Sequence, residues 1–269
     1  MKLTNENYFS PEMQMKYMGV SQYKDFLDCP ARALATVRGE YKEEMTKAML
    51  IGSFVDSYFE GSLDKFKDEH PEIFNSRTGE LKVDYQNANV IIARLEADPV
   101  CSAYLAGEKQ VIKTAELFGT PWKIKIDSYF PGEKIVDLKV MRSMERIMGV
   151  SFIQHWGYDI QMAVYSEIEY LANKAEKKER LETYLDVATK EEPADLGVIH
   201  IPAWRRKECL SEVEKHMPRI LAYKKGEIEA PGCGVCPYCR SKKVVTGPID
   251  FEMVGFSNKE LAAMQGKAF

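Results

Sequence analysis

The sequence lacks several patterns that mark common classes of protein. No run of about 18 apolar residues occurs, so no segment is predicted to span a membrane. Residues 1–20 do not contain a basic segment followed by an apolar one, the pattern of a secretory signal. Neither a Walker A loop nor a dinucleotide-binding glycine motif is present. We therefore expect a cytoplasmic protein that binds no nucleotide through either motif.

Histidine is also scarce, and the 37 basic residues are outnumbered by 41 acidic ones. The four histidines show no metal-ligand spacing and support neither a Ser/His/Asp nor a Cys/His triad. The formal net charge is −4, so any contact with nucleic acid has to come from a local basic patch. Each of the candidate patches could alone be an ordinary solvated surface: Lys123 with Lys125, Arg142 with Arg146, Arg205 to Lys207, and Lys242 with Lys243.

The length and composition bound the architecture. With 269 residues, of which 45% are hydrophobic, the chain can bury one substantial core. We expect one domain over residues 1–269. Its core spans about 20–225, a cysteine-containing segment lies at about 229–243, and a tail follows at 244–269.

Residues 111–140 predict three short strands, at 111–118, 122–130 and 134–140. Each is rich in β-branched and aromatic residues and is bounded by Gly and Pro. If residues 131–133 form a three-residue hairpin loop, Phe130 pairs with Lys134, and Asp127 lies opposite Asp137. Directly opposed side chains have Cβ atoms roughly 4.5–5.5 Å apart. Two carboxylates this close repel each other unless a cation lies between them.

Lys139 follows Asp137 by two residues and therefore points from the same face of the strand. Two acids and a lysine on one face suit a Mg²⁺-dependent phosphodiesterase, in which carboxylates hold the ion and the lysine positions water or neutralises charge on the phosphate. Two alternatives remain open at this point. The charges could belong to a solvated strand face, or a hairpin loop one residue longer or shorter could put the acids on opposite faces.

Three segments that are predicted to be helical contain further candidate functional residues. Residues 20–38 predict a helix that Pro30 kinks or splits, with Cys29 at the break. A helix at 47–60 places Asp56 on the same face as Gly52, and a helix at 157–174 makes Gln161 and Tyr165 neighbours. Without other information, Asp56 could be a surface acid and the other two an ordinary boundary pair. Further elements are predicted as helices at 83–105 (interrupted near Pro99) and 207–224, strands at 196–201 and 249–254, and a short helix after Ser257.

The six cysteines are unevenly placed. Cys233, Cys236 and Cys239 form a C-x-x-C-x-x-C motif, whereas Cys29, Cys101 and Cys209 are isolated. A disulfide framework is improbable in a cytosolic protein, and the motif has the spacing of metal ligands. Cys101 and Cys209 are interpreted as small core residues.

Four short motifs resemble a known family in order as well as in type: GSFVD (52–56), KIKID (123–127), DLK (137–139) and QMAVY (161–165). They are similar to the RecB-type branch of the PD-(D/E)xK nucleases, and most of all to phage and prophage RecE-like exonucleases of the exodeoxyribonuclease VIII type. The resemblance covers roughly residues 20–240. It implies an α/β, restriction-endonuclease-like fold, with a central mixed sheet built on residues 111–140 and flanked by helices 47–60 and 157–174.

The resemblance also implies a role for each matching residue. Asp127, Asp137 and the Leu138 carbonyl would bind Mg²⁺ or Mn²⁺, and Lys139 would be the catalytic lysine. Gln161 and Tyr165, with Arg142 nearby, would hold the DNA. Asp56 stands where many relatives carry His, so its part in the metal site is in doubt. Glu116 is a further acid that could match one preceding the motif Asp.

The cysteines resemble those of the AddB and CRISPR-associated RecB-like nucleases, in which one N-terminal and three C-terminal cysteines hold a [4Fe–4S] cluster. By that resemblance, Cys29 with Cys233, Cys236 and Cys239 would hold a structural iron–sulfur cluster. The second gap of this triplet is shorter than in those relatives, so zinc is the alternative.

The function expected from the resemblance is a metal-dependent exonuclease that digests DNA from duplex ends, on the 5′ strand. Its setting would be phage recombination, with a phage single-strand annealing protein as a partner and a toroidal homo-oligomer as the assembly. Two alternatives remain: a CRISPR-associated or repair exonuclease that acts on single strands, and a DNA-binding module whose catalytic site is degenerate.

Overall fold

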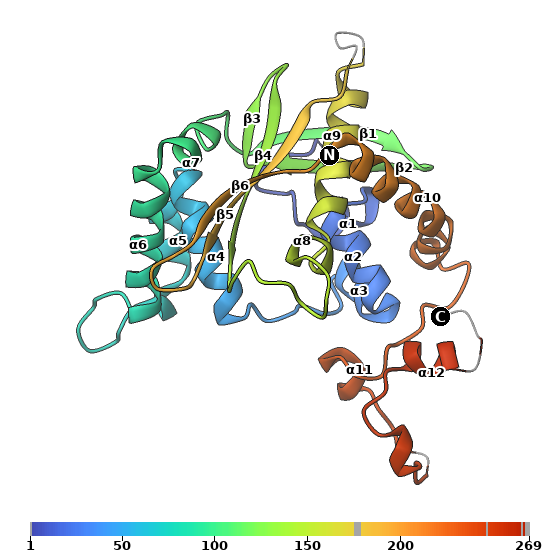
Figure 1. The fold of residues 1–269 in the computed structure, drawn as a ribbon. Coiled ribbons are helices and arrows are strands. Elements are labelled where there is room, and N and C mark those ends of the chain that lie inside the picture. The colour runs from blue at the N-terminus through green and yellow to red at the C-terminus, as the bar shows by residue number, and fades with distance from the viewer. Residues whose placement is uncertain (1, 175–178, 246, 265, 267–269) are drawn as a thin grey trace. The chain divides into compact units, whose positions relative to one another are not determined.

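The computed structural model describes residues 2–174, 179–245, 247–264 and 266. The chain divides into two compact units, and each is described by itself. The first combines Met1–Glu43, Glu116–Trp122 and Glu212–Phe269, and the second combines Glu44–Ala115 and Lys123–Ser211. The expectation of a single domain stays a prediction. Figure 1 labels the elements of both units.

The second unit contains a mixed four-stranded sheet in the order β3-β4-β5-β6 (Figure 1). Strands β4 and β5 run parallel, whereas β3 and β6 are each antiparallel to their neighbour. The strands are β3 (Ser128–Phe130), β4 (Lys134–Met141), β5 (Glu182–Thr189) and β6 (Leu196–His200). This mixed sheet with flanking helices confirms the expected fold class.

Strand β5 is absent from the sequence-based prediction, although it pairs with both β4 and β6. A strand buried on both faces shows no alternation of polar and apolar residues. Here Asp186 also interrupts the apolar residues and is itself fully buried. Neither feature of the local sequence indicates a central strand.

The predicted hairpin forms with the expected register. Phe130 pairs with Lys134 and Ser128 with Val136 across the turn at residues 131–133. Gly132 has φ +79° in that turn, a conformation that glycine adopts without strain.

The three strands predicted in residues 111–140 differ from the structure in two respects. Asp127 lies in a bend that separates β2 (Thr120–Ile126) from β3, and β2 pairs with β1 (Val111–Leu117) in a separate two-stranded sheet. The turn between β1 and β2 is made by Phe118 and Gly119, both with positive φ, which is the conformation of a tight two-residue hairpin turn. The sequence had indicated a turn at 119–121.

Two helices flank the sheet in the second unit. Leu138 and Ala188 belong to an apolar cluster with residues of α4 (Lys47–Phe59) and α6 (Val83–Ala97). Asp137, the preceding residue of β4, contacts α9 (Tyr158–Ala172) instead. Because successive side chains of a strand point to opposite faces, α4 and α9 cover opposite faces of β4. Both helices lie close to where the sequence predicts them.

The remaining helices of the second unit are short. The predicted helix at 83–105 is two helices, because Asp98 ends α6 and caps the next helix, accepting hydrogen bonds from the Val100 and Cys101 N–H groups at 2.9 and 3.0 Å. The short helices are α5 (Leu63–Glu69), η1 (Pro71–Ile73), α7 (Pro99–Tyr104) and α8 (Phe152–His155).

The first unit is mostly helical. Cys29 has an extended backbone and separates α2 (Val20–Asp28) from α3 (Pro30–Val37), because Pro30 can start a helix but cannot continue one. The predicted strand at 249–254 is wrong: that stretch contains the 3₁₀ helix η2 (Phe251–Met253). The other helices are α1 (Pro11–Lys16), α10 (Ala203–Lys225, which begins in the second unit), α11 (Pro237–Ser241) and α12 (Asn258–Met264). In the part of the chain that is described, no helix has the length and apolar character needed to cross a membrane.

Candidate active site

Asp137 and Lys139 lie on one face of β4. The apolar residues around them bury the strand, and only 2% of Asp137 is exposed to solvent. The Lys139 ammonium forms an ion pair with Asp137 Oδ2, and 21% of the lysine side chain remains exposed. The lysine therefore neutralises a buried carboxylate while its side chain still reaches the surface.

Gln161 on α9 holds the other oxygen of the same carboxylate. Its Nε2 donates a hydrogen bond of 2.6 Å to Asp137 Oδ1. Both Asp137 oxygens thus have a protein partner, and the orientation of this side chain is fixed by two different elements.

Asp127 lies in the bend immediately before β3. Its Oδ2 accepts a hydrogen bond from the Leu138 N–H at 3.2 Å, and its carboxyl group is within hydrogen-bonding reach of Asp137. Burial, followed by the charge of Asp137, raises the pKa of Asp127 well above its usual range. The backbone of β4 therefore holds a second carboxyl group beside the first.

Asp56 approaches this pair from α4. The helix begins at Lys47, where the Thr46 side chain accepts a hydrogen bond from the Met49 N–H at 3.2 Å. Asp56 Oδ1 is buried and has no hydrogen-bond partner among the described residues. Burial raises the pKa of Asp56 to about 7, an effect that Lys139 opposes and Asp137 reinforces.

A cavity of about 10 Å³ lies among these acids, about the space that one water molecule or ion needs. Its lining comes from several elements of the second unit: Asp56, Phe59, Glu60, Leu105, Lys109, Asp127 and Leu138. Desolvated carboxyl groups, one of them with an unpartnered buried oxygen, are oxygen ligands that suit a hard divalent cation. The residues present therefore fit Mg²⁺ or Mn²⁺.

The electrostatics keep Lys139 charged. Burial alone would lower its pKa, but the charges of Asp137 and Asp127 outweigh that effect and raise the pKa above its usual range. The ammonium also lies 5.3 Å from the centre of the Tyr158 ring, a distance at which a cation and an aromatic face attract each other. At neutral pH Lys139 is thus a hydrogen-bond donor and not a base.

The structure does not test the roles expected of three other residues. Tyr165 is a partly buried residue of α9, one turn after Gln161. Arg142 is exposed directly after β4, and among the described residues no ion pair links it to the acids. Glu116 is exposed on β1 and does not line the small cavity. Their proposed roles stay predictions.

Sequence reasoning missed Glu60 and Lys109, which both line the cavity. Glu60 follows Asp56 by four residues, so helical periodicity could have placed the two acids on the same face. Lys109 lies in an irregular segment after α7, where no local pattern indicates what its side chain faces.

The four predicted cysteines meet in the first unit. Cys29 lies at the break between α2 and α3, and the other three lie in and before α11. The sulfur of Cys29 is 3.6 Å from that of Cys239 and 3.8 Å from that of Cys236. The Cys233 and Cys239 sulfurs are 3.9 Å apart. Among the described residues this is the one group of three or more His, Cys, Asp or Glu residues whose ligand atoms all lie within 4.8 Å of one another.

Backbone N–H groups support this cysteine cluster. The Cys233 N–H donates to the Cys29 sulfur at 3.4 Å, and the Cys236 and Cys239 N–H groups donate to the preceding sulfur of the triplet at 3.3 and 3.4 Å. Such hydrogen bonds stabilise thiolates, the form that binds metal.

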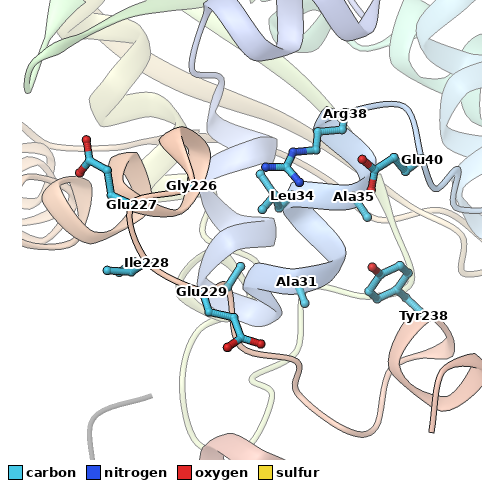
Figure 2. Close-up of a pocket in the computed structure, with 11 residues that line it drawn as sticks. Ala31, Leu34, Ala35, Arg38, Glu40, Gly226, Glu227, Ile228, Glu229 and Tyr238 are labelled. Atoms are coloured by element: carbon cyan, nitrogen blue, oxygen red, sulfur yellow. The ribbon is translucent and has the colours of Figure 1, made fainter.

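A larger cavity of about 450 Å³ lies in the same unit (Figure 2). One wall is α3, with Arg38 near its end, and another is the segment from Gly226 to Ala230. Tyr238 also lines the cavity, and it stands between Cys236 and Cys239 in the sequence. Metal binding at the cysteine cluster would therefore fix part of this wall.

Comparison with known proteins places the geometry in a family. A crystal structure from Eubacterium rectale, described as that of a "putative exonuclease", is 44% identical to this chain. The match covers 95% of this chain and 100% of that one, with a TM-score of 0.88. The crystal structure of SSO0001 is 13% identical over 90% of this chain and 98% of that one, with a TM-score of only 0.31. No curated protein matches.

The profile of one protein family matches residues 19–242, which include every residue of the acidic site and of the cysteine cluster. That range also contains the four motifs on which the resemblance to the PD-(D/E)xK nucleases rests. The chain therefore belongs to the family described as "PDDEXK-like domain of unknown function (DUF3799)".

Proposed function

We propose that this protein is a Mg²⁺- or Mn²⁺-dependent exonuclease that hydrolyses phosphodiester bonds of DNA from duplex ends. The observation that carries the proposal is the arrangement around Asp137, whose two oxygens are held by Lys139 and Gln161 beside Asp127 and Asp56. The similar protein from Eubacterium rectale, described as an exonuclease, supports the same activity.

The chain's own residues suggest how they would act. A divalent ion held by Asp56, Asp127 and Asp137 would supply Lewis acidity toward the phosphate and lower the pKa of water. Lys139, which stays protonated, would donate a hydrogen bond to the attacking water or to the phosphate oxygens and stabilise the charge that develops there. Gln161 would keep Asp137 oriented throughout.

The first test is release of acid-soluble nucleotides from linear duplex DNA in the presence of Mg²⁺. Lys139→Met and Asp137→Asn should each lower the rate by about 100-fold or more, because each removes a charge that acts in the transition state. Lys134→Met is the matched control: this lysine lies on the same strand but pairs with Glu133, outside the site. Wild-type rates in all four proteins would show that the site is not used.

The finer features of the proposal follow the resemblance to RecE-like exonucleases. We propose digestion of the 5′ strand in phage or prophage recombination, with a single-strand annealing protein as partner. Duplexes labelled at the 5′ or at the 3′ end distinguish the two polarities by which label is released first. Faster digestion of single-stranded than of duplex DNA would instead favour the repair or CRISPR-associated role.

We also propose that the cysteine cluster binds structural zinc. Four thiolates around Zn²⁺ at about 2.3 Å form a tetrahedron with edges of roughly 3.8 Å. Three of the six sulfur–sulfur distances here are 3.6, 3.8 and 3.9 Å, and all four sulfurs lie within 4.8 Å of one another. In a [4Fe–4S] cluster each sulfur binds a separate corner and would lie farther from the others. The sequence favoured iron–sulfur, whereas these distances favour zinc. A visible absorbance band in protein purified without oxygen would contradict zinc, because Zn²⁺ gives no visible band whereas an iron–sulfur cluster is coloured.

A further inference from the structure

The segment between α7 and β1 is pinned against β3, next to Asp127. The Gly107 N–H donates to Ser128 Oγ at 2.8 Å, and a Cβ on Gly107 would lie only 2.8 Å from the Tyr129 carbonyl oxygen. Glu108 and Tyr129 exchange both backbone hydrogen bonds, at 2.8 and 2.9 Å. Only glycine permits this close approach, so the path of the segment toward the acids is fixed.

The same segment is strained where it reaches Glu60. Gln110 has φ +53°, a conformation that residues other than glycine rarely adopt. Its Nε2 donates a hydrogen bond of 2.6 Å to Glu60 Oε1. Such strain persists only where surrounding contacts enforce it, and it concentrates at functional sites. The contact orients the acid that follows Asp56 by one helical turn.

Lys109 lies between these two anchored positions and lines the cavity with Asp56, Glu60 and Asp127. Its ammonium donates a hydrogen bond to the Leu105 carbonyl. Burial lowers the pKa of Lys109, and the charges of Asp127, Glu60 and Asp186 oppose that effect. Lys139, by contrast, makes its ion pair with Asp137. One lysine thus pairs with Asp137, and a second, Lys109, lines the cavity that Asp127 also lines.

The position of Lys109 bears on how many divalent ions the site can hold. Two-metal sites place their ions about 3.5–4 Å apart, with carboxylates on both sides. Here the cavity has a volume of about 10 Å³, room for one ion. A positive charge on Lys109, which lines this cavity together with Asp127 and Glu60, would also repel a second divalent ion.

We propose that Lys109 is a positioning residue that serves in place of a second divalent ion, so that the acidic site binds a single Mg²⁺ or Mn²⁺. The inference rests on the proposed function, because it concerns the same metal site. Lys109 would then supply the positive charge beside Asp127, and Lys139, which pairs with Asp137, would be the lysine that faces the substrate.

The experiment counts bound Mn²⁺ by titrating the full-length protein and recording the electron paramagnetic resonance signal of the free ion. The wild type should bind one Mn²⁺ per chain at the acidic site, and Asp137→Asn should lose it. Lys109→Met should bind two, and Lys109→Gln, which can still donate to the Leu105 carbonyl, should also bind two. Lys109→Arg keeps the charge and should bind one.

Lys190→Met is the matched control. Lys190 is also a partly buried lysine of the second unit that donates to a backbone carbonyl, that of Ala48 at 2.9 Å, but it does not line the acidic cavity. The Lys190→Met protein should bind one Mn²⁺, as the wild type does. Two ions in the wild type, or one ion in both folded uncharged Lys109 variants, would overturn the inference while leaving the nuclease proposal intact. A wild type that binds no Mn²⁺ and cuts no DNA would overturn both.

Discussion

At the scale of single residues, the structure gives Gln161 a different partner from the one expected. The resemblance implies contact with the DNA end, whereas the side chain amide donates to Asp137 at 2.6 Å. A group that hydrogen-bonds a metal-binding carboxylate orients it and tunes its affinity for the ion. The structure therefore supports a positioning role for Gln161, and a contact with DNA stays a prediction.

Gln161→Ala should weaken Mn²⁺ binding by about 10-fold, because outer partners of metal ligands typically contribute 10- to 100-fold. The dissociation constant, measured by isothermal titration calorimetry, checks this expectation. Asn89→Ala removes a similar amide from an exposed position on α6 and should leave the affinity unchanged. If the loss appears only in the affinity for DNA, the role implied by the resemblance is correct instead.

At the scale of elements, β5 places a buried acid in the middle of the sheet. Asp186 is fully buried and pairs in register with Leu138. Among the residues that the structure describes, its carboxylate oxygens have no hydrogen-bond partner except the weak donor thiol of Cys101. Burial raises the pKa of Asp186 from 3.8 to about 6. The folded protein thus holds this proton more tightly than the unfolded chain, and the resulting stability is present below pH 4 and lost as the pH rises through 6.

Asp186→Asn should therefore stabilise the protein at pH 8, by up to about 3 kcal/mol, and have little effect near pH 4. Urea denaturation at the two pH values measures the difference in the free energy of unfolding. The exposed Asp195→Asn serves as the control and should show no dependence of this kind. An equal effect of Asp186→Asn at both pH values would mean that the carboxyl group is not desolvated.

At the scale of the whole molecule, the cysteine cluster joins residues that are far apart in the chain. Cys29 and Cys233 are separated by 204 positions, so a metal bound to both closes a very long loop. Closing such a loop restricts the unfolded chain, and binding to a site that exists only in the folded state adds to stability. The cluster is thus expected to be structural, consistent with its position in a different unit from the acids.

Cys236→Ser should remove the bound metal and lower the free energy of unfolding by about 5 kcal/mol, the value expected for a cross-link across a loop of this length. Metal content by mass spectrometry and thermal unfolding measure the two effects. Cys209→Ser changes a buried cysteine outside the cluster and should retain the metal. Full metal content in Cys236→Ser would show that this sulfur is not a ligand.

The sequence by itself determined the parts of this protein that depend on local chemistry. The spacing of Cys233, Cys236 and Cys239 indicates metal binding, and Pro30 predicts the break at Cys29. The Gly- and Pro-bounded hairpin set the register of Phe130 and Lys134, which brought Asp127 near Asp137. These inferences hold because a tight turn or a proline constrains the backbone whatever surrounds it.

Only the tertiary structure decided what depends on groups distant in sequence. Strand β5 carries no pattern of its own, since its burial on both faces comes from its neighbours. Lys109 meets Asp127 and Glu60 because a separate segment is pinned against β3, and the sulfur spacing that favours zinc exists only once both ends of the chain meet. Charge, burial and metal geometry act through space, and the order of residues along the chain does not specify those distances.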